Sequence, residues 1–110
     1  MIIGTGVDIV KIERFINLSP RFMLRVFSHT EREYIGKKNN SPATMAGLFA
    51  AKEAVVKAMG TGFAGFWPCE IEILHDENGK PYVEMEGVVV HVSISHSETD
   101  AVAFVVMEVQ

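Results

Sequence analysis

The sequence predicts an α+β fold, with an antiparallel β-sheet packed on one long helix in a single domain that spans residues 1–110. Two observations lead to this class. Apolar residues at helical spacing run from about Pro42 to Met59, with no further proline inside that stretch. Strand-like segments lie before and after this helix, and the Asn78-Gly79 pair between two of them is a strong hairpin-turn signal.

The first strand-like segment, Ile2 to Val10, is apolar and rich in β-branched residues, and it contains two glycines. Asp8 is the lone carboxylate in this segment. Because a buried carboxylate without a partner is costly, Asp8 would need a hydrogen-bond donor, a cation or a metal. The alternative is an aspartate at the end of the strand that caps the following turn.

The segment from Lys11 to Phe27 predicts one or two short helices, broken near Ser19-Pro20. Arginines and phenylalanines alternate along it, namely Arg14, Phe15, Arg21, Phe22, Arg25 and Phe27. This composition is typical of a protein-binding surface, although an amphipathic helix with its arginines in solvent has the same composition. Thr30 and Glu33 have the spacing of a capping box, which predicts another short helix before a polar loop from Lys37 to Asn40.

The long helix has clear signals at both ends. Ser41 can cap free N–H groups, the proline after it suits the first helical position, and Gly60 is a natural stop. Glu53 and Lys57 lie four residues apart on one face, either as an ordinary exposed pair or as part of a site. Lys52 falls within the apolar stripe, where its stem would lie on the core and its ammonium would reach water.

The loop from Gly60 to Gly65 is rich in glycine and either approaches a ligand or is an ordinary linker. Strands are predicted at Glu70–His75, Pro81–Met85, Val88–Ser95 and Ala101–Val109, with turns at Asp76–Lys80 and Ser97–Asp100. His96 follows the third of these strands, where a single histidine is either structural or part of a site. A Ser-His-Asp hydrolase has no support, because the G-x-S-x-G pattern is absent.

Composition limits the classes of function. Hydrophobic residues make up 48% of the 110 residues, which is enough for a core. No apolar run approaches the length of a membrane span, and the N-terminus lacks the features of a signal peptide, so we expect no membrane segment. Cys69 is the only cysteine, which fits a reducing cytoplasm.

Charge is divided unevenly along the chain. Residues 1–57 carry nine of the ten lysines and arginines but only five of the fourteen acidic residues, within a net charge of −4. The folded chain can therefore present a basic surface that attracts phosphates or an acidic protein. Nucleic acid is not expected as a partner, because the whole chain is acidic and carries no recognised nucleic-acid module.

Five motifs follow one another along nearly the whole chain. They are Gly4-x-Gly6-x-Asp8-Ile9-Val10, Phe49-Ala50-Ala51-Lys52-Glu53-Ala54 with Lys57, Gly60-Thr61-Gly62, Asn78-Gly79-Lys80-Pro81 and Ser93-Ile94-Ser95-His96-Ser97. Together they resemble the holo-acyl-carrier-protein synthases, which are the short, single-domain phosphopantetheinyl transferases. The first two motifs are specific in combination.

The resemblance implies a Mg²⁺-dependent transfer of 4'-phosphopantetheine from coenzyme A to a serine of apo acyl carrier protein. The reaction releases adenosine 3',5'-bisphosphate and supports fatty acid biosynthesis in the cytoplasm. The resemblance implies that Asp8 and Glu53 hold Mg²⁺ and that Lys57 is the third catalytic group. Two carboxylates with substrate phosphates and water are ligands that Mg²⁺ prefers. It also implies a homotrimer with each site at a subunit interface.

The resemblance also implies binding roles for other residues. Contacts to coenzyme A are implied for His96, Lys52, Gly60, Gly62 and Pro81. The first arginine-aromatic helix is implied to receive the acidic carrier protein, through Arg14, Arg21, Arg25 and Phe22.

Three features depart from the family pattern. Leu48 stands where the helix motif of the family has an arginine, which removes a phosphate contact. Asn39-Asn40 stand where the family has basic residues, and Lys37 and Lys38 lie just upstream as substitutes. The short link from Glu86 to Val90 leaves no room for the helix that the family carries before its last motif.

Two other classes of function are alternatives. A non-catalytic module that binds acyl carrier protein or coenzyme A is suggested by Leu48 and by the shortened link. A structural oligomerisation domain is suggested only by the high apolar content.

Overall fold

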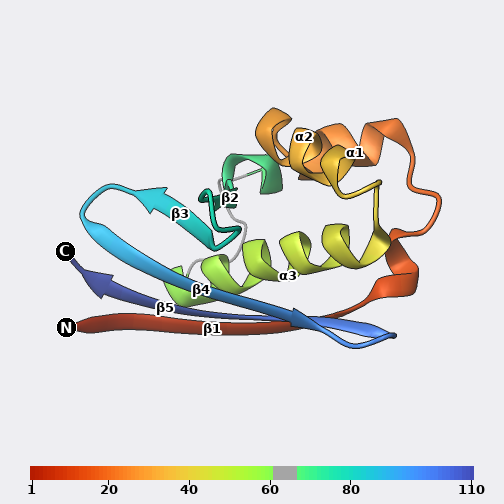
Figure 1. Ribbon diagram of the computed structural model, residues 1–110. Helices are drawn as coiled ribbons and strands as arrows, with labels where there is room; N and C mark the ends of the chain where they lie inside the picture. Colours follow the sequence, from red (N-terminus) through yellow and green to blue (C-terminus); the bar gives the residue numbers. More distant parts are fainter. Residues whose placement is uncertain (61–66) are drawn as a thin grey trace.

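In the computed structural model, which describes residues 1–60 and 67–110, a five-stranded antiparallel sheet packs on one long helix (Figure 1). The elements in order are β1 (Ile2–Lys11), η1 (Ile12–Phe15), α1 (Pro20–Val26), α2 (His29–Lys37), α3 (Pro42–Met59), η2 (Pro68–Glu70), β2 (Leu74–His75), β3 (Pro81–Met85), β4 (Val88–His96) and β5 (Asp100–Val109). The strand order across the sheet is β1-β5-β4-β3-β2, so the first and last strands of the chain are neighbours. The predicted α+β fold is confirmed.

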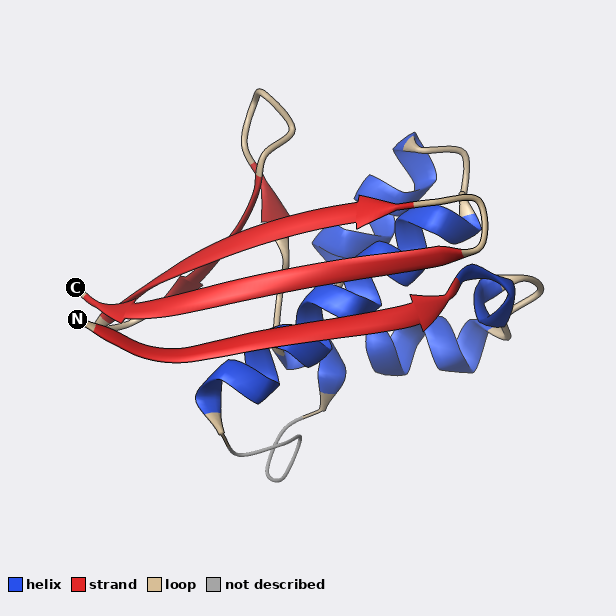
Figure 2. Ribbon diagram, turned by 90° about the horizontal axis from the view of Figure 1, so that it is seen from below, coloured by secondary structure: helices blue, strands red, loops and turns tan. Residues whose placement is uncertain are grey.

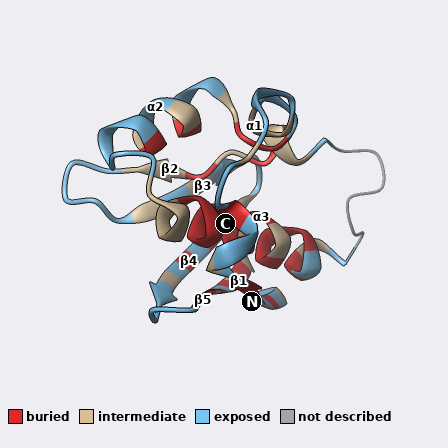
Figure 3. Ribbon diagram, turned by 90° about the vertical axis from the view of Figure 1, so that its right-hand side faces the viewer, coloured by how far each residue is buried: buried red, intermediate tan, exposed pale blue. Residues whose placement is uncertain are grey.

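Helix α3 has the bounds that the sequence predicts. The Ser41 hydroxyl accepts a hydrogen bond from the backbone N–H of Thr44, and Gly60 ends the helix in the left-handed conformation, with a φ of 79°. The helix lies against β1, β5 and β4. The helices of the described residues lie on the same face of the sheet, as the view from below shows (Figure 2). The buried residues therefore gather between α3 and the strands beneath it (Figure 3).

Two glycines let β1 lie directly on α3. A Cβ atom at Gly6 would lie 1.9 Å from the carbonyl oxygen of Ala54, and one at Gly4 would lie 2.0 Å from that of Ala58. No other side chain fits between strand and helix at these two positions. Side chains alternate along a strand, so Asp8 points to the same side as the two glycines.

The strand predicted at residues 70–75 is wrong over most of its length. Residues 68–70 form the short helix η2, and only Leu74 and His75 pair with β3. The physical reason is that side chains form hydrogen bonds with the backbone N–H and C=O groups that a β-strand would need for pairing with its neighbour. Lys52 donates a hydrogen bond to the carbonyl of Ile71, and the N–H of Ile73 donates to Glu31.

The capping box predicted at Thr30 and Glu33 is also displaced. Helix α2 begins at His29, and Ser28 is its N-cap. The Ser28 hydroxyl accepts a hydrogen bond from the N–H of Glu31, and the Glu31 carboxylate accepts one from the N–H of Ser28. In contrast, the predicted break near Ser19-Pro20 is confirmed, because the Ser19 hydroxyl caps α1.

The C-terminal hairpins agree with the sequence. The Asp76 carboxylate accepts hydrogen bonds from the N–H groups of Asn78 and Lys80, which closes the predicted turn. A two-residue turn, with Gly87 at a φ of 82°, joins β3 to β4, so no helix lies between them. Within residues 1–60 and 67–110, no helix has the length and apolar character needed to cross a membrane.

Candidate active site

Asp8 and Lys57 form an ion pair that joins β1 to α3. Lys57 Nζ lies 3.1 Å from Asp8 Oδ1 and 3.0 Å from the carbonyl oxygen of Val7, and donates a hydrogen bond to each. The Asp8 side chain is 17% exposed and that of Lys57 is 53% exposed, so a solute can reach the pair. The expected cation beside Asp8 is confirmed. A turn-capping role is wrong, because Asp8 lies well inside β1.

Glu53 lies one turn before Lys57 on α3 and is half-buried. Burial raises the pKa of the Glu53 carboxyl, and the negative charge of Asp8 raises it further, whereas Lys57 and Arg14 lower it. No ion pair of the described residues includes Glu53. The ion pair of Lys57 is with Asp8, so among the described residues the Glu53 carboxylate lies near Lys57 and Arg14 without a direct ion-pair partner.

Two nearby carboxylates, one of them without an ion-pair partner among the described residues, fit a magnesium ion. Mg²⁺ takes one or two protein carboxylates and completes its shell with phosphate and water oxygens. Residues 1–60 and 67–110 contain no group of three or more His, Cys, Asp or Glu side chains that could hold a metal. An ion at this place would therefore use Asp8 and Glu53 together with oxygens of a bound substrate. The assignment of these two ligands stays a prediction.

A basic surface begins beside the carboxylates. The Arg14 guanidinium in η1 lies 5.7 Å from the centroid of the Phe49 ring on α3, and its charge lowers the pKa of Glu53. Phe22 is half-buried and packs edge-on against Phe15, with 6.2 Å between the ring centroids, so it holds α1 against η1. Of the predicted carrier-binding residues, Arg14 is thus the one that lies next to the predicted metal site.

The rest of this surface lies on α1 and on the segment after α3. Arg21 and Arg25 are exposed. The Arg25 guanidinium lies 5.8 Å from the centroid of the Trp67 ring, and Trp67 is 59% exposed. Sequence reasoning missed Trp67, although an exposed tryptophan beside an arginine is typical of interfaces. Binding of a carrier protein here stays a prediction.

His96 and Pro81 line a second part of the candidate site, a pocket of about 310 Å³ that also includes Leu48. His96 Nδ1 lies 3.0 Å from the carbonyl oxygen of Ser97. The ring therefore donates from Nδ1 and keeps Nε2 for a ligand. Asp8, Glu53 and Lys57 do not line this pocket, so in one chain the predicted residues form two separate groups.

Three further residues line the same pocket. Tyr34 on α2 and His75 on β2 are stacked, with 3.7 Å between the ring centroids and 1° between the ring planes. The ammonium of Lys38 lies over the Tyr34 ring, with Nζ 5.5 Å from its centroid. Sequence reasoning missed Tyr34 and His75, because the two are 41 positions apart and only the fold brings them together.

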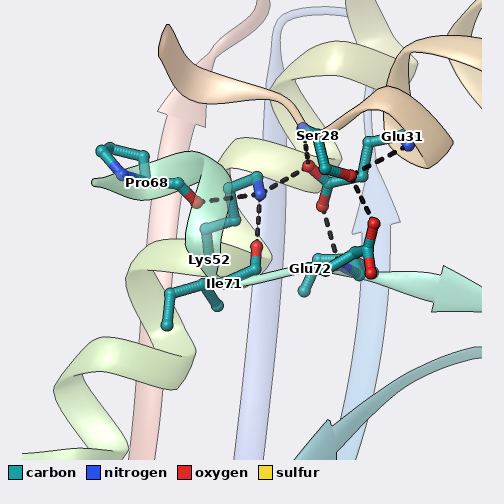
Figure 4. A network of polar contacts seen from close by, with 7 residues as sticks. Ser28, Glu31, Lys52, Pro68, Ile71 and Glu72 are labelled. Carbon is teal, nitrogen blue, oxygen red and sulfur yellow. Dashed lines mark hydrogen bonds and ion pairs between the residues drawn. The ribbon is translucent and has the colours of Figure 1, made fainter. Parts of the chain in front are cut away.

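Lys52 reaches neither group. Its side chain has no exposed surface, and Nζ lies 2.5 Å from Glu31 Oε1 and 3.1 Å from the carbonyl oxygen of Pro68 (Figure 4). Burial lowers the pKa of Lys52 and raises that of Glu31, and the charge of each partner acts in the opposite direction. Oxygen atoms of the protein itself accept the hydrogen bonds that this ammonium donates. The predictions that it contacts coenzyme A or reaches water are therefore wrong in this structure.

The pair belongs to a buried network that joins three parts of the chain. Glu31 Oε2 accepts a hydrogen bond of 2.7 Å from the N–H of Ile73, and the Ser28 hydroxyl donates one of 2.7 Å to Glu72 (Figure 4). The network fixes α2, α3 and residues 68–73 to one another. Since Lys52 and Glu53 are adjacent on α3, burial of Lys52 also fixes the side of the helix on which Glu53 lies.

Of the glycine-rich loop predicted from Gly60 to Gly65, the structure describes only Gly60. Gly60 is the C-cap of α3, at the end opposite to the residues that line the pocket. Gly62 lies outside the described residues, so the prediction of a coenzyme contact there stays untested.

Comparison with known proteins identifies the family that this chain resembles. A family model described as the 4'-phosphopantetheinyl transferase superfamily matches residues 4–106. A holo-[acyl-carrier-protein] synthase of Clostridium botulinum is 44% identical over 122 residues, and the match covers 99% of both chains. One from Alkaliphilus metalliredigens is 42% identical over 117 residues, covering 94% of this chain and 96% of the other.

Solved structures similar to this fold come from the same family. A crystal structure of a holo-(acyl-carrier-protein) synthase from Bacillus anthracis in complex with CoA (3',5'-ADP) has a TM-score of 0.89 at 38% identity, covering 100% of this chain and 99% of the other. The Helicobacter pylori synthase in complex with coenzyme A has a TM-score of 0.82 at 28% identity, covering 94% and 99%. The chain therefore belongs to the holo-[acyl-carrier-protein] synthases, enzymes of the 4'-phosphopantetheinyl transferase superfamily.

Proposed function

We propose that this chain transfers 4'-phosphopantetheine from coenzyme A to a serine of apo acyl carrier protein, with Mg²⁺ as cofactor, and releases adenosine 3',5'-bisphosphate. The observation that carries the proposal is the Lys57–Asp8 pair beside Glu53, in a chain that matches holo-[acyl-carrier-protein] synthases over its full length. A role in fatty acid biosynthesis follows from the carrier protein that this reaction activates.

Each residue has a defined part in this reaction. The serine oxygen forms a bond to the phosphorus next to pantetheine, and the bond from that phosphorus to the bridging oxygen of adenosine bisphosphate breaks. Asp8 and Glu53 would hold Mg²⁺, which supplies neutralisation of the charge that develops on the phosphate oxygens. Lys57 donates a hydrogen bond to the leaving oxygen. The proton of the serine passes to water or to a carboxylate of the site.

The functional unit is a homotrimer, in which neighbouring subunits unite the two groups of residues into complete sites. The uncovered face of the sheet supports this assembly. It exposes large apolar side chains that no helix of the described chain covers, among them Val7, Ile9, Val89 and Phe104. Large apolar side chains exposed together on one face of a monomer favour an interaction surface there. The location in the cytoplasm, predicted from the single Cys69, stays a prediction.

The test is intact-mass spectrometry of apo acyl carrier protein after incubation with the chain, coenzyme A and Mg²⁺. We expect a mass gain of one phosphopantetheine, which is absent when EDTA is added and absent with the Glu53→Gln variant. A gain that survives both EDTA and the substitution would contradict the metal assignment. No gain with several carriers, together with tight coenzyme A binding, would favour the non-catalytic binding module suggested by Leu48.

A further inference from the structure

An exposed tryptophan lies beside the arginines of α1. Trp67 is the only tryptophan of the chain, and its side chain is 59% exposed. The Arg25 guanidinium, 5.8 Å from the centroid of the Trp67 ring, connects the indole to α1. Leu24, the residue before Arg25, is 61% exposed as well. A tryptophan and an arginine in contact on the surface are typical of the residues that carry most of the binding energy in protein interfaces.

The backbone of Trp67 is fixed to the rest of the fold. Its N–H donates a hydrogen bond of 3.1 Å to Glu70 Oε1, and its carbonyl oxygen accepts one of 2.9 Å from the N–H of Glu70. The carbonyl oxygen of the next residue, Pro68, accepts a hydrogen bond of 3.1 Å from the buried Lys52 Nζ. An aromatic side chain on a fixed backbone loses little conformational freedom when it binds a partner. The exposed indole is therefore a preorganised contact.

The indole also orients Arg25. A guanidinium over an aromatic ring uses its flat face for that contact and keeps the N–H groups at its edge for a carboxylate. No ion pair among the described residues includes Arg21 or Arg25. Helix α1 itself contains no acidic residue, and the two arginines lie four positions apart on one side of it. The surface therefore offers guanidinium donors next to exposed apolar area.

The partner that fits this surface presents carboxylates next to a bulky apolar side chain. The two acidic residues that follow Trp67 are engaged within the protein, since Glu70 bonds to the Trp67 N–H and Glu72 accepts a hydrogen bond of 2.7 Å from the Ser28 hydroxyl. A second copy of the chain that met this surface face to face would bring arginines against arginines, which is unfavourable. An acidic protein is the complementary partner, and apo acyl carrier protein is the protein substrate of the proposed reaction.

We propose that Trp67 is a docking residue for the acyl carrier protein. Its indole packs against an apolar side chain of the carrier and holds Arg25 towards a carboxylate of the carrier. The inference rests on the proposed function for the identity of the partner. It adds the segment after α3 to the arginines of α1, and it adds an apolar contact to a surface of charges. Because salt screens charges but does not weaken apolar burial, part of the carrier affinity is resistant to salt.

The fluorescence of Trp67 reports this docking directly, because the chain has no other tryptophan. An apo acyl carrier protein that lacks tryptophan is titrated into the chain without coenzyme A, so that binding is measured in the absence of transfer. We expect the emission maximum to move to shorter wavelength as the indole leaves water, and the change to saturate with carrier. Coenzyme A with Mg²⁺, and dilution of the chain alone, should each leave the emission unchanged.

Substitutions test the energetic part of the proposal. We expect Trp67→Ala to raise KM for apo carrier about tenfold, with kcat and KM for coenzyme A unchanged. Trp67→Phe keeps a ring beside Arg25 and should retain most of the affinity. Val109→Ala, which truncates a 52% exposed apolar side chain on β5, is the matched control and should behave as the wild type.

Salt and a double variant separate the two parts of the contact. The loss in Trp67→Ala should persist in about 0.5 M salt, where the effect of an arginine substitution shrinks. The double variant Trp67→Ala/Arg25→Gln should lose less than the product of the two single losses, because Arg25 without the indole is already poorly oriented.

Three results would overturn the proposal. They are a wild-type KM for carrier in Trp67→Ala, an emission that carrier leaves unchanged while transfer proceeds, and an emission that responds equally to coenzyme A or to dilution. The last of these would mean that the coenzyme or a second copy covers Trp67. A carrier that shifts the emission but gains no mass with coenzyme A and Mg²⁺ would contradict the proposed reaction and support the docking role.

Discussion

The ammonium of Lys57 bridges helix and strand, since it lies 3.1 Å from Asp8 Oδ1 and 3.0 Å from the Val7 carbonyl oxygen. Through this contact the end of α3 is tied to the middle of β1. The charge of Lys57 also lowers the pKa of Glu53, so it acts on both carboxylates. A phosphate that approaches these residues meets a hydrogen-bond donor and two carboxylates of the kind that can hold Mg²⁺, a combination that suits phosphoryl transfer.

Removal of either carboxylate should therefore slow transfer strongly without unfolding the chain. We expect Asp8→Asn and Glu53→Gln each to lower kcat/KM by a factor on the order of 10²–10³, the range for loss of one electrostatic stabiliser. Transfer would be followed by intact mass at several Mg²⁺ concentrations, with Glu77→Gln as an exposed control. Activity within threefold of wild type in both variants, as a rough limit, would rule out the metal assignment.

The close contact of β1 with α3 predicts sensitivity at Gly6. A Cβ atom there would lie 1.9 Å from the Ala54 carbonyl oxygen, so Gly6→Ala must push the strand from the helix and move Asp8. We expect a loss of about 1–3 kcal/mol in the free energy of unfolding, as for other overpacked sites, and a loss of transfer activity. Gly36→Ala is the matched control, because a Cβ at Gly36 meets nothing within 4 Å. Equal stability of the two variants in urea would contradict this packing.

The buried pair of Glu31 and Lys52 predicts a large effect of breaking it and a smaller effect of removing it. Lys52→Met leaves the Glu31 carboxylate buried without its cation, which should cost about 3–5 kcal/mol. The double variant Glu31→Gln/Lys52→Met should recover part of that loss, because no buried charge is left. Chemical denaturation of the single and double variants would measure both. A double variant that is less stable than either single one would show that the network, and not the charge pair, dominates.

Local signals made α3 predictable, whereas long-range contacts decided the parts that were wrong. Ser41, the proline after it and Gly60 set the helix bounds within a few residues of themselves. The sequence contains two overlapping capping patterns, starting at Ser28 and Thr30, and the first prevails because Glu31 is buried against Lys52. No local rule reveals that choice.

The candidate site shows the same contrast between what the sequence reveals and what only the fold reveals. The resemblance to a family identified Asp8, Glu53 and His96, but only the fold reveals that Asp8 meets Lys57 while His96 faces a separate pocket. The Lys52 assignment failed because its partner lies 21 residues away on another helix. A helical wheel of α3 alone cannot include such a partner.

The basic face predicts that binding of the carrier protein depends on charge. Arg21 and Arg25 are exposed on α1, so Arg21→Glu or Arg25→Glu should raise KM for apo acyl carrier protein about tenfold at low salt, with KM for coenzyme A unchanged. The effect should shrink in 0.5 M salt, roughly three times physiological ionic strength, because exposed charges are screened. The exposed Lys11→Glu, on β1, controls for net charge. A parallel rise in KM for coenzyme A would contradict a docking role.

The titration of Glu53 offers a direct test of the site without substrate. Burial and the charge of Asp8 raise the pKa of the Glu53 carboxyl, whereas Lys57 lowers it. The Glu53 carboxyl signal, followed by NMR against pH, should therefore move to lower pH in Asp8→Asn and to higher pH in Lys57→Met. Glu77→Gln should leave it unchanged. A Glu53 carboxyl that titrates alike in all four proteins would mean that the groups do not share one site.

The same shift fixes the sign of a stability effect. A carboxyl whose pKa is raised on folding binds more protons in the folded state than in the unfolded state between its two pKa values. Its contribution to the free energy of unfolding is therefore lost as the pH rises through that window. Glu53→Gln should remove this loss, so in metal-free buffer at pH 7 the variant should melt above the wild type. In Mg²⁺ and coenzyme A the order should reverse, because only the wild type gains stability from the bound ligands.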